Sequence, residues 1–556
     1  MKGYFGLVLH SHLPYVRRGG RWPHGEEMLH EAILDTYLPL VATLEDLATE
    51  GIKFGVTIGV TPVLAEQLAD PDILAGFEVY LDERLSLAEL DARRFDQAGD
   101  RVMAGLARFW HDHFARLRAR FEGYGRQLIP RLRALAEAGY VELIGGPATH
   151  PYLPLLERDS SIYGQLRTGL EAHRRHFGRR PAGVWLPECG YRPAFIHPET
   201  GIRKPGLEEF LEAQGIRFFF TDTRPIEGGE LVGKTAGEVV GPYGVPERRR
   251  VAPERPVEGR GTTFRPYYVG DSNVAVFGRE EKTGLQVWSA TQGYPGDFYY
   301  REFHRRDPVS GLRYWRVTDA SGDLGRKQPY EPDRARERVE AHADHFVGIL
   351  EERLGGYFRQ TGQPGIVVAA YDTELFGHWW FEGCNWLAGV LRRLSRHPWV
   401  EAVRVSDYLE AFPPDAAINL PESSWGEGGG HYTWNNDSNR WMWPHIHAAE
   451  RMAERLVALG GDAGGGLEEF LRQAARELVL LQASDWPFLV STGQAPDYAA
   501  RRFQEHLARF HRLAAVVLRG FADPADRQFL KVIAEQDNPF EFIDFRWFAE
   551  REGRAS

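Results

Sequence analysis

The feature that most constrains the fold of this chain is a repeated pattern in which a short apolar run ends in polar residues and a helix-like stretch follows. Continuous apolar runs of this kind are typical of strands that are buried on both faces, as in a parallel sheet. Their alternation with helical stretches predicts an α/β fold built on a parallel sheet or barrel. The runs that show the pattern are 4–9, 53–58, 141–144, 183–186, 217–221 and 365–370.

Polar side chains stand directly after these runs. In α/β barrels the active site is built at the carboxyl ends of the strands, because the loops that follow the strands meet there. The sequence therefore predicts one site made of residues that are far apart along the chain. The residues in such positions are His10, His12, His150, Glu188, Asp222 and Asp372.

Two regions depart from the pattern. Residues from about 222 to 283 are rich in Gly, Pro and Arg and have little helical period. We expect an inserted loop-rich subdomain there, since a loop of that length in a compact domain is usually a lid, a binding loop or disorder. From about residue 441 onward the chain is strongly helical, with apolar residues at three-to-four spacing in 467–481 and 498–521. This spacing predicts a C-terminal helical domain.

Two carboxylates are candidates for acid–base and nucleophilic chemistry. Glu188 follows a short run and lies between Pro187 and Gly190, which favour a tight turn. Asp372 follows the clearest run and precedes a histidine and two tryptophans. Glycoside hydrolysis needs two carboxylates that flank the scissile bond. A glutamate after a strand is more commonly a surface residue, and we expect at least one of the two tryptophans, Trp379 and Trp380, to pack into the core.

His10 and His12 point to the same side if the segment is still extended. This spacing also fits a metal site, for which His150 and Asp372 would supply further ligands. A metal-dependent amidohydrolase or sugar deacetylase is therefore an alternative. Hydrogen-bonded structural histidines are a third interpretation of equal weight.

The segment 425–436 is a glycine-rich loop that contains Trp425 and Trp434. It lacks the lysine and the following hydroxyl residue of a phosphate-binding loop. Stacking on a polysaccharide explains tryptophans on such a loop better than packing does. Asp485 and Trp486 interrupt the C-terminal helices and fit the same cleft, or else a helix stop with a packed tryptophan.

Composition excludes several classes of function. The net charge of −11 and the isoelectric point of about 6.0 argue against a nucleic-acid partner. Two cysteines make a disulfide framework improbable and fit a reducing compartment. No run of 18 apolar residues exists, so we expect no membrane span. The N-terminus reads as a buried strand and not as a signal peptide, which predicts a cytoplasmic protein.

Taken together, five segments resemble the signatures of glycoside hydrolase family 57, in the family's order. In the third segment the family's glutamate nucleophile falls on Glu188, and in the fourth its catalytic aspartate falls on Asp372. The family has no metal and no other cofactor. The five segments are 10–15, 145–150, 185–191, 371–380 and 425–436.

Within that family the chain resembles the 1,4-α-glucan branching enzymes, through the stretches 285–290, 294–296, 376–380 and 483–488. The resemblance implies an α/β fold with an incomplete seven-stranded (β/α) barrel (1–190 and 272–410), an inserted lid subdomain (191–271) and a C-terminal α-helical domain (411–556) that contributes to the cleft. It implies an α-1,4-glucan as partner. The substrate-binding residues that we expect are His10, His12, His150, Trp288, Trp379, Trp425, Trp434, Asp485 and Tyr268.

The reaction implied is cleavage of an α-1,4-glucan by double displacement, followed by transfer of the chain to a 6-hydroxyl. The alternatives on the same site are an α-amylase-type hydrolase and a 4-α-glucanotransferase. A non-catalytic glucan-binding protein is disfavoured by the presence of both carboxylates. For the mobile-loop tyrosine of branching enzymes, the candidates are Tyr243, Tyr267 and Tyr268.

Overall fold

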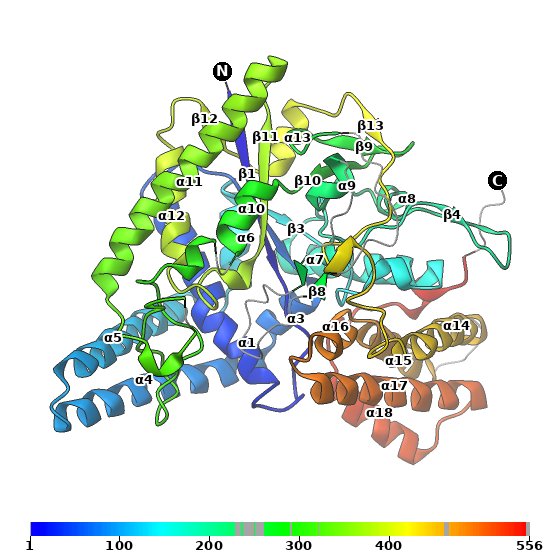
Figure 1. The fold of residues 1–556 in the computed structure, drawn as a ribbon. Helices are drawn as coiled ribbons and strands as arrows, with labels where there is room; N and C mark the ends of the chain where they lie inside the picture. The colour runs from blue at the N-terminus through cyan, green and yellow to red at the C-terminus, as the bar shows by residue number, and fades with distance from the viewer. Residues whose placement is uncertain are drawn as a thin grey trace.

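The computed structural model describes residues 2–227, 261–289, 292–320, 322–460 and 466–551, and the backbone of two short strands, β7 (Thr235–Ala236) and β8 (Arg249–Arg250). Figure 1 shows an α/β body with a group of helices packed beneath one side of it. Among the described helices, none combines the length and the apolar character that crossing a bilayer requires.

The first sheet has five strands and is entirely parallel. Its order is β11-β1-β2-β3, and β12 pairs with the start of β1. In the register, His10 lies opposite Asp372 on one side and Gly59 on the other, so the carboxyl ends of three strands are level. The strands are β1 (Gly3–Ser11), β2 (Val56–Val60), β3 (Val141–Ile144), β11 (Ile366–Asp372) and β12 (Val400–Ala402).

The second sheet has four strands in the order β13-β9-β10-β6. β6 and β10 are parallel, whereas β9 runs antiparallel to β10. The strands are β6 (Phe218–Thr221), β9 (Tyr267–Val269), β10 (Ala275–Gly278) and β13 (Ala417–Ile418). The α/β class is therefore confirmed, but the described strands form two sheets and not one seven-stranded barrel sheet.

Hydrogen bonds and apolar side chains connect the two sheets. Parallel bridges join Gly145 to Val184 and Gly183 to Phe218, which links β3 to β6. On the other side, the backbone N–H of Glu280 donates to the carbonyl of Val368 at 2.9 Å. Side chains from both sheets fill one buried cluster, which three residues of α13 (Val405–Ala411) also join. The cluster includes Val8, Ile144, Phe218, Phe277, Val368, Tyr408 and Leu409.

Helices cover the outer faces of the strands, where a second buried cluster holds the alternate side chains Leu7, Ile58 and Val367. The long pair α4 and α5 projects from the body (Figure 1), and each begins at an aspartate whose carboxylate accepts backbone N–H groups of the first turn. The helices of the body are α1 (Glu26–Ala32), the π-helix η1 (Ile33–Tyr37), α2 (Leu38–Thr49), α3 (Pro62–Ala69), α4 (Pro71–Gln97), α5 (Arg101–Gly123), α6 (Ile129–Glu137), α7 (Asp159–Phe177), α8 (Leu207–Ala213), α9 (Thr223–Glu227), α10 (Glu281–Trp288), α11 (Pro332–Thr361) and α12 (Gly383–Leu394).

The predicted helical C-terminal region is confirmed. Helices α15 and α17 cover nearly the two stretches whose apolar spacing predicted them, and they pack on each other through buried leucines, valines and phenylalanines. The helices are α14 (Met442–Gly460), α15 (Glu468–Leu481), α16 (Asp485–Thr492), α17 (Pro496–Arg519) and α18 (Pro524–Gln536).

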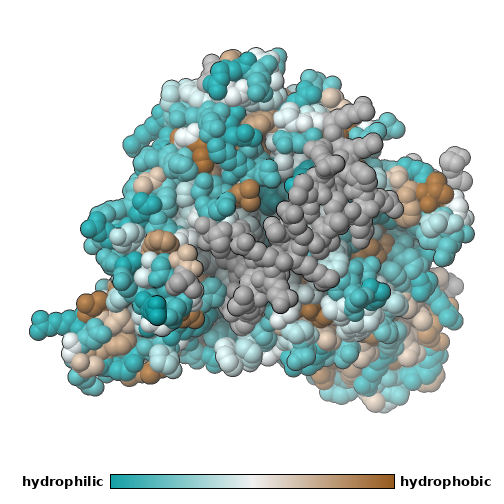
Figure 2. Space-filling view, viewed as in Figure 1, coloured by the Kyte–Doolittle hydropathy of each residue, from teal (hydrophilic) through white to brown (hydrophobic). Residues whose placement is uncertain are grey.

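The range 191–271, which we expect to form an inserted subdomain, includes one strand that belongs to the body. β6 lies within this range and pairs in parallel with β10. The four consecutive apolar and β-forming residues of β6 are buried, which places them in the sheet. Within the Gly-, Pro- and Arg-rich stretch, residues 228–234, 237–248 and 251–260 lie outside the described residues. On the face in Figure 2 the described surface is mainly hydrophilic, with hydrophobic residues in small groups.

Candidate active site

Three histidines lie together at the carboxyl end of the first sheet. Nε2 of His10 is 3.0 Å from Nε2 of His150, which follows β3. The ring of His12 stacks on that of His150 with centroids 3.9 Å apart, and His10 stacks on Trp185 at 4.8 Å. Because His10 is level with Asp372 in the sheet, the structure gathers these predicted residues at one edge.

Glu188 occupies a strained turn after the strand-like residues 183–185. It lies in the 3₁₀ turn η3 (Pro187–Cys189), with φ of 62°, and the next residue, Cys189, has φ of 49°. The left-handed region is costly for residues other than glycine, so surrounding contacts must hold it. Backbone contacts do so: the N–H of Trp425 donates to the carbonyl of Glu188 at 3.0 Å.

Two donors hold the carboxylate of Glu188. The indole Nε1 of Trp425 donates to Oε2 at 2.7 Å, and the hydroxyl of Ser484 donates to Oε1 at 3.3 Å. Nδ1 of His150 lies 3.0 Å from the same hydroxyl and 3.8 Å from Oε1. Hydrogen bonds from fixed donors favour an ionised carboxylate in one orientation, as a nucleophile requires.

The C-terminal helical region contributes directly to this site. Ser484 precedes α16, and its backbone N–H donates to the carbonyl of His150 at 3.0 Å. Asp485, the first residue of α16, lies 2.9 Å from Nε2 of His12, whose Nδ1 contacts the hydroxyl of Thr61 at 3.1 Å. The site therefore combines the sheet and the C-terminal helices.

Burial dominates the electrostatics of the two carboxylates. It raises the pKa of Glu188 to about 7, although the hydrogen bond from Trp425 acts in the opposite direction, and the charge of Asp372 adds to the rise. Burial likewise raises the pKa of Asp372 to about 6, against the opposing effect of Arg279 and His12. Two close carboxyl groups whose pKa values lie near neutrality can exchange protons with a substrate.

The three histidines differ in charge. Burial, together with neighbouring His12, holds the pKa of His10 and of His150 well below the usual value. Burial would also lower the pKa of His12, but Asp485, Glu188 and Glu374 outweigh it and raise the pKa. The site thus favours a single imidazolium, at His12.

A further buried carboxyl group lies beside Asp372. Glu374 accepts hydrogen bonds at Oε1 from the hydroxyl of Tyr37 and, at 3.2 Å, from the backbone N–H of His12. Burial and the charge of Asp372 raise the pKa of Glu374 to about 8. A carboxyl group with that pKa is mostly neutral at pH 7 and can itself donate a hydrogen bond.

The predicted aromatic platforms fall into two groups. Trp288, Trp379 and Trp425 are half-buried, so part of each indole is accessible. Trp288 ends α10, and Trp379 packs on Phe303 with centroids 4.5 Å apart. Trp380 is 1% exposed, which confirms that one of the adjacent tryptophans belongs to the core.

Two predicted substrate-binding residues lie away from the accessible part of the site. Trp434 is 1% exposed and stacks on Tyr152 at 4.2 Å, because the glycine-rich loop folds over it, with Gly426 against its ring. Tyr268 lies on β9 opposite Ala275, at the amino end of β10, whereas the site lies at the carboxyl ends. Tyr267 is in the same strand, and Tyr243 lies outside the described residues.

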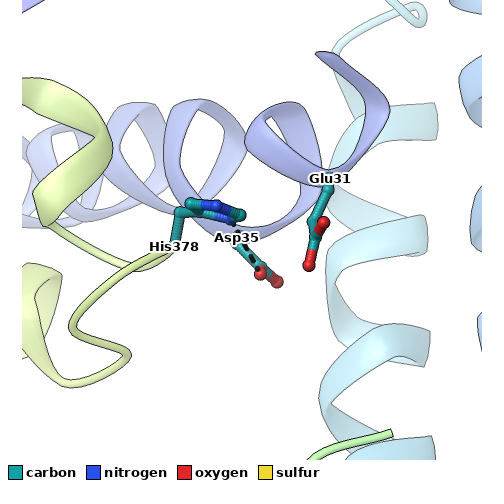
Figure 3. A group of neighbouring side chains, drawn as sticks. All are labelled: Glu31, Asp35 and His378. Carbon is teal, nitrogen blue, oxygen red and sulfur yellow. Dashed lines mark ion pairs between the residues drawn. The ribbon is translucent and has the colours of Figure 1, made fainter. Parts of the chain in front are cut away.

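Clusters that could hold a metal occur elsewhere in the described part of the chain. One is formed by Glu31, Asp35 and His378 (Figure 3). Arg313 already faces its carboxylates, at 2.7 Å from Glu31 and 3.6 Å from Asp35. The other, in the C-terminal helices, consists of Glu477, His506 and Asp537 and contains an ion pair of Asp537 with Arg509. Neither cluster includes the strand-end histidines that the metal-dependent alternative requires.

Comparison with known families agrees with this geometry. Residues 6–421 match the model of glycosyl hydrolase family 57. The chain belongs to glycosyl hydrolase family 57. A second match, over residues 445–548, is to the C-terminal region of 1,4-alpha-glucan branching enzymes.

Relatives in family 57 cover nearly the whole chain. The 1,4-alpha-glucan branching enzyme TK1436 of Thermococcus kodakarensis is 44% identical over 97% of this chain and 78% of its own length. A probable 1,4-alpha-glucan branching enzyme of Mycobacterium tuberculosis is 34% identical over 94% of both chains. The crystal structure of TK1436 superposes with a TM-score of 0.88, covering 100% of this chain and 98% of that one. The α-amylase AmyC of Thermotoga maritima superposes with a TM-score of 0.83 at 28% identity, covering 99% and 100%.

Sequence reasoning missed several residues of this family 57 site. Arg279 follows the apolar run of β10, so the strand-end rule that selected Asp222 could have found it. Ser484 is adjacent to the predicted Asp485 but has no signal of its own. Thr61 directly follows β2, so the same rule could have found it. Tyr37 contacts the site only because the chain folds back, and no local pattern identifies it.

Proposed function

We propose that this chain is a 1,4-α-glucan branching enzyme, which cleaves an α-1,4-glucan and transfers the released segment to a 6-hydroxyl to form an α-1,6 branch. The observation that carries the proposal is the 44% identity to a branching enzyme over 97% of the chain. The half-buried pair Glu188 and Asp372 supports it, because retaining glycoside chemistry requires two carboxyl groups at one site.

In the first displacement, Asp372 donates its proton to the oxygen of the scissile bond while Glu188 attacks the anomeric carbon. The glycosidic bond breaks, the leaving chain departs as an alcohol, and a covalent glycosyl-enzyme forms with inverted configuration. Asp372 then removes the proton of an incoming 6-hydroxyl, whose oxygen displaces Glu188. The second inversion restores the α configuration and leaves Asp372 protonated for the next cycle.

The donors around Glu188 support its assignment as nucleophile. Trp425 and Ser484 hold its two oxygens, so the attacking atom is oriented before the substrate arrives. The half-buried Trp288, Trp379 and Trp425 provide apolar faces for glucose rings, and the imidazole groups of His10, His12 and His150, with Asp485, provide partners for hydroxyls.

The two sheets together support the incomplete (β/α) barrel that we propose. Strand pairing or bridges link each of seven segments to the next in space, in the order β11, β1, β2, β3, 183–185, β6 and β10. One backbone hydrogen bond, from Glu280 to Val368, spans from the end of β10 to β11. The C-terminal helical domain then follows the body from about residue 411. Synthesis of a glycogen-type polymer and a cytoplasmic location stay predictions.

A hydrolase of the α-amylase type is the second candidate. The TM-score of 0.83 with an α-amylase at 28% identity favours it, because the same pair of carboxylates could hand the glycosyl group to water. A 4-α-glucanotransferase would use a 4-hydroxyl instead. The three activities differ in the acceptor and not in the first displacement.

The test is an incubation of the purified protein with amylose in buffer that contains a chelator. Reducing ends are counted before and after treatment with a debranching enzyme. Branching predicts new chain ends that appear only after debranching. Reducing ends that rise directly, with no increment on debranching, would replace branching with hydrolysis.

A further inference from the structure

Arg279 lies at the carboxyl edge of the second sheet, where its position follows from the strand register. β6 and β10 pair with Thr221 opposite Gly278, so Asp222 and Arg279 are the next residues of adjacent parallel strands. The backbone N–H of Arg279 donates to the carbonyl of Thr221 at 2.9 Å. Its Nη2 and Nε donate to Oδ1 of Asp222 at 2.9 and 3.2 Å. Strand pairing therefore holds the backbone of Arg279, and Asp222 holds its guanidinium.

The guanidinium of Arg279 also packs on the residue that holds Glu188. Its Cζ is 5.5 Å from the ring centroid of Trp425, within the range of a cation–π contact. The Nε1 of the same indole donates to Glu188 at 2.7 Å. A planar guanidinium restrains the plane of an indole in a way that an ammonium does not.

Arg279 also acts electrostatically on Asp372, the other carboxyl group of the site. Arg279 is 23% exposed at the side chain and Asp222 is 7% exposed, so the pair is only weakly screened. Burial raises the pKa of Asp372, and Arg279 is the largest influence in the opposite direction, followed by His12. Other titratable groups also bear on the pair of carboxylates: His12 and Asp485 act on Glu188, and the pKa of Glu374 is raised by the charge of Asp372.

We propose that Arg279, fixed by Asp222, is a positioning residue that serves both carboxyl groups: it restrains the indole that orients Glu188, and it stabilises the anion that Asp372 becomes after donating its proton. The inference rests on the proposed function, since it assigns Arg279 a role in the same double displacement. It explains why two oppositely charged, largely buried residues follow adjacent strands beside two buried acids.

The experiment compares wild-type enzyme with Arg279→Gln, Arg279→Lys and Asp222→Asn. Initial rates of branching on amylose are measured from pH 4 to 10, and kcat and kcat/KM are extracted at each pH. The matched control is Arg217→Gln. Arg217 precedes β6 at the opposite edge of the same sheet and forms an exposed ion pair with Glu410, so its loss removes a similar charge far from the carboxylates.

We expect kcat of Arg279→Gln to fall about 10- to 100-fold, because a small displacement of a nucleophile is costly. Loss of the cation also moves the alkaline limb of kcat/KM upward by about one pH unit, as Asp372 then holds its proton to higher pH. Arg279→Lys keeps the alkaline limb of the wild type but loses rate, since the charge remains and the planar contact does not. Asp222→Asn loses rate without an upward shift.

An alkaline limb of folded Arg279→Gln that coincides with that of the wild type would overturn the proposal, as would wild-type kcat in Arg279→Lys and Asp222→Asn together. Thermal unfolding establishes whether each variant is folded. If Arg279→Gln is not folded, the kcat of Arg279→Lys still tests the proposal. Failure of the proposed function looks different: debranching would then release no new chain ends from the products of the wild type and of the arginine variants alike.

Discussion

At the scale of single residues, the site is defined by buried groups whose charge depends on their neighbours. The side chain of Glu188 is 14% exposed, and the two donors that orient it contact its carboxylate. Arg279 and His12 both lower the pKa of Asp372. Burial raises both pKa values, because ionising either carboxyl group away from water costs free energy that its neutral form does not.

Replacing Glu188 by Gln should abolish turnover while glucan binding persists. We expect kcat to fall by at least about a thousandfold, because the covalent intermediate cannot form. Initial rates and a binding assay on the same preparation measure both effects. A rate near that of the wild type would remove Glu188 from the mechanism.

The same variant should change the pH dependence of stability. The pKa of Glu188 rises from 4.5 to about 7 on folding, so its contribution to stability is present below pH 4.5 and is lost as the pH rises through 7. The stability of Glu188→Gln relative to wild type should therefore increase by up to about 3 kcal/mol between pH 4 and pH 8. Thermal unfolding at both pH values measures it. A stability difference between Glu188→Gln and the wild type that is the same at both pH values would contradict the conclusion that burial raises the pKa of Glu188.

At the scale of elements, the π-helix η1 supports the loop that follows β11. Tyr37 donates to Glu374, and the backbone N–H of His378 donates to the hydroxyl of Thr36 at 3.1 Å. The two segments approach so closely at Gly377 that a Cβ there would lie 1.8 Å from the carbonyl oxygen of Asp35. π-helical turns are rare and occur frequently at functional sites, which fits a role in positioning Asp372.

Gly377→Ala should therefore be strongly destabilising. Its φ of +109° is unfavourable for alanine, and the added methyl group would force η1 away from the loop, at a cost of about 3 kcal/mol or more. Gly215→Ala is the matched control, because Gly215 has φ of +77° but open space at the Cβ position. It should cost only about 1 kcal/mol. Equal losses in denaturant unfolding would show that the contact with η1 contributes nothing.

At the scale of the whole molecule, the C-terminal helices complete a site that the sheet only begins. Ser484 contacts Glu188 and His150, and Asp485 pairs with His12. Residues after β1 are also anchored there: Arg17 donates to the carbonyl of Gln536 at 3.1 Å. Catalytic geometry and domain packing are thus coupled.

Asp485→Asn should weaken both catalysis and the packing of the C-terminal helices against the site. The pKa of His12 is raised on folding, so the stability that this pair contributes is present below pH 6.5 and lost at higher pH. We expect a larger loss of stability at pH 6 than at pH 9, and a fall of about tenfold in kcat/KM near neutrality. Asp497→Asn is the control, since Asp497 is exposed near the start of the next helix. Equal losses of stability at both pH values would show that the stabilising effect of Asp485 does not depend on the charge of His12.

The sequence by itself determined the features that depend on neighbours along the chain. Apolar runs predicted β1, β2, β3, β6 and β11, the polar residues after such runs predicted Glu188, Asp372 and the three histidines as one group, and apolar spacing predicted the C-terminal helices. Only the tertiary structure decided that Trp434 is buried, that Tyr268 lies at the end of its sheet away from the site, and that Ser484 belongs to the site. Burial and proximity arise from how distant segments pack and from the register of paired strands, and a local pattern of residue types specifies neither.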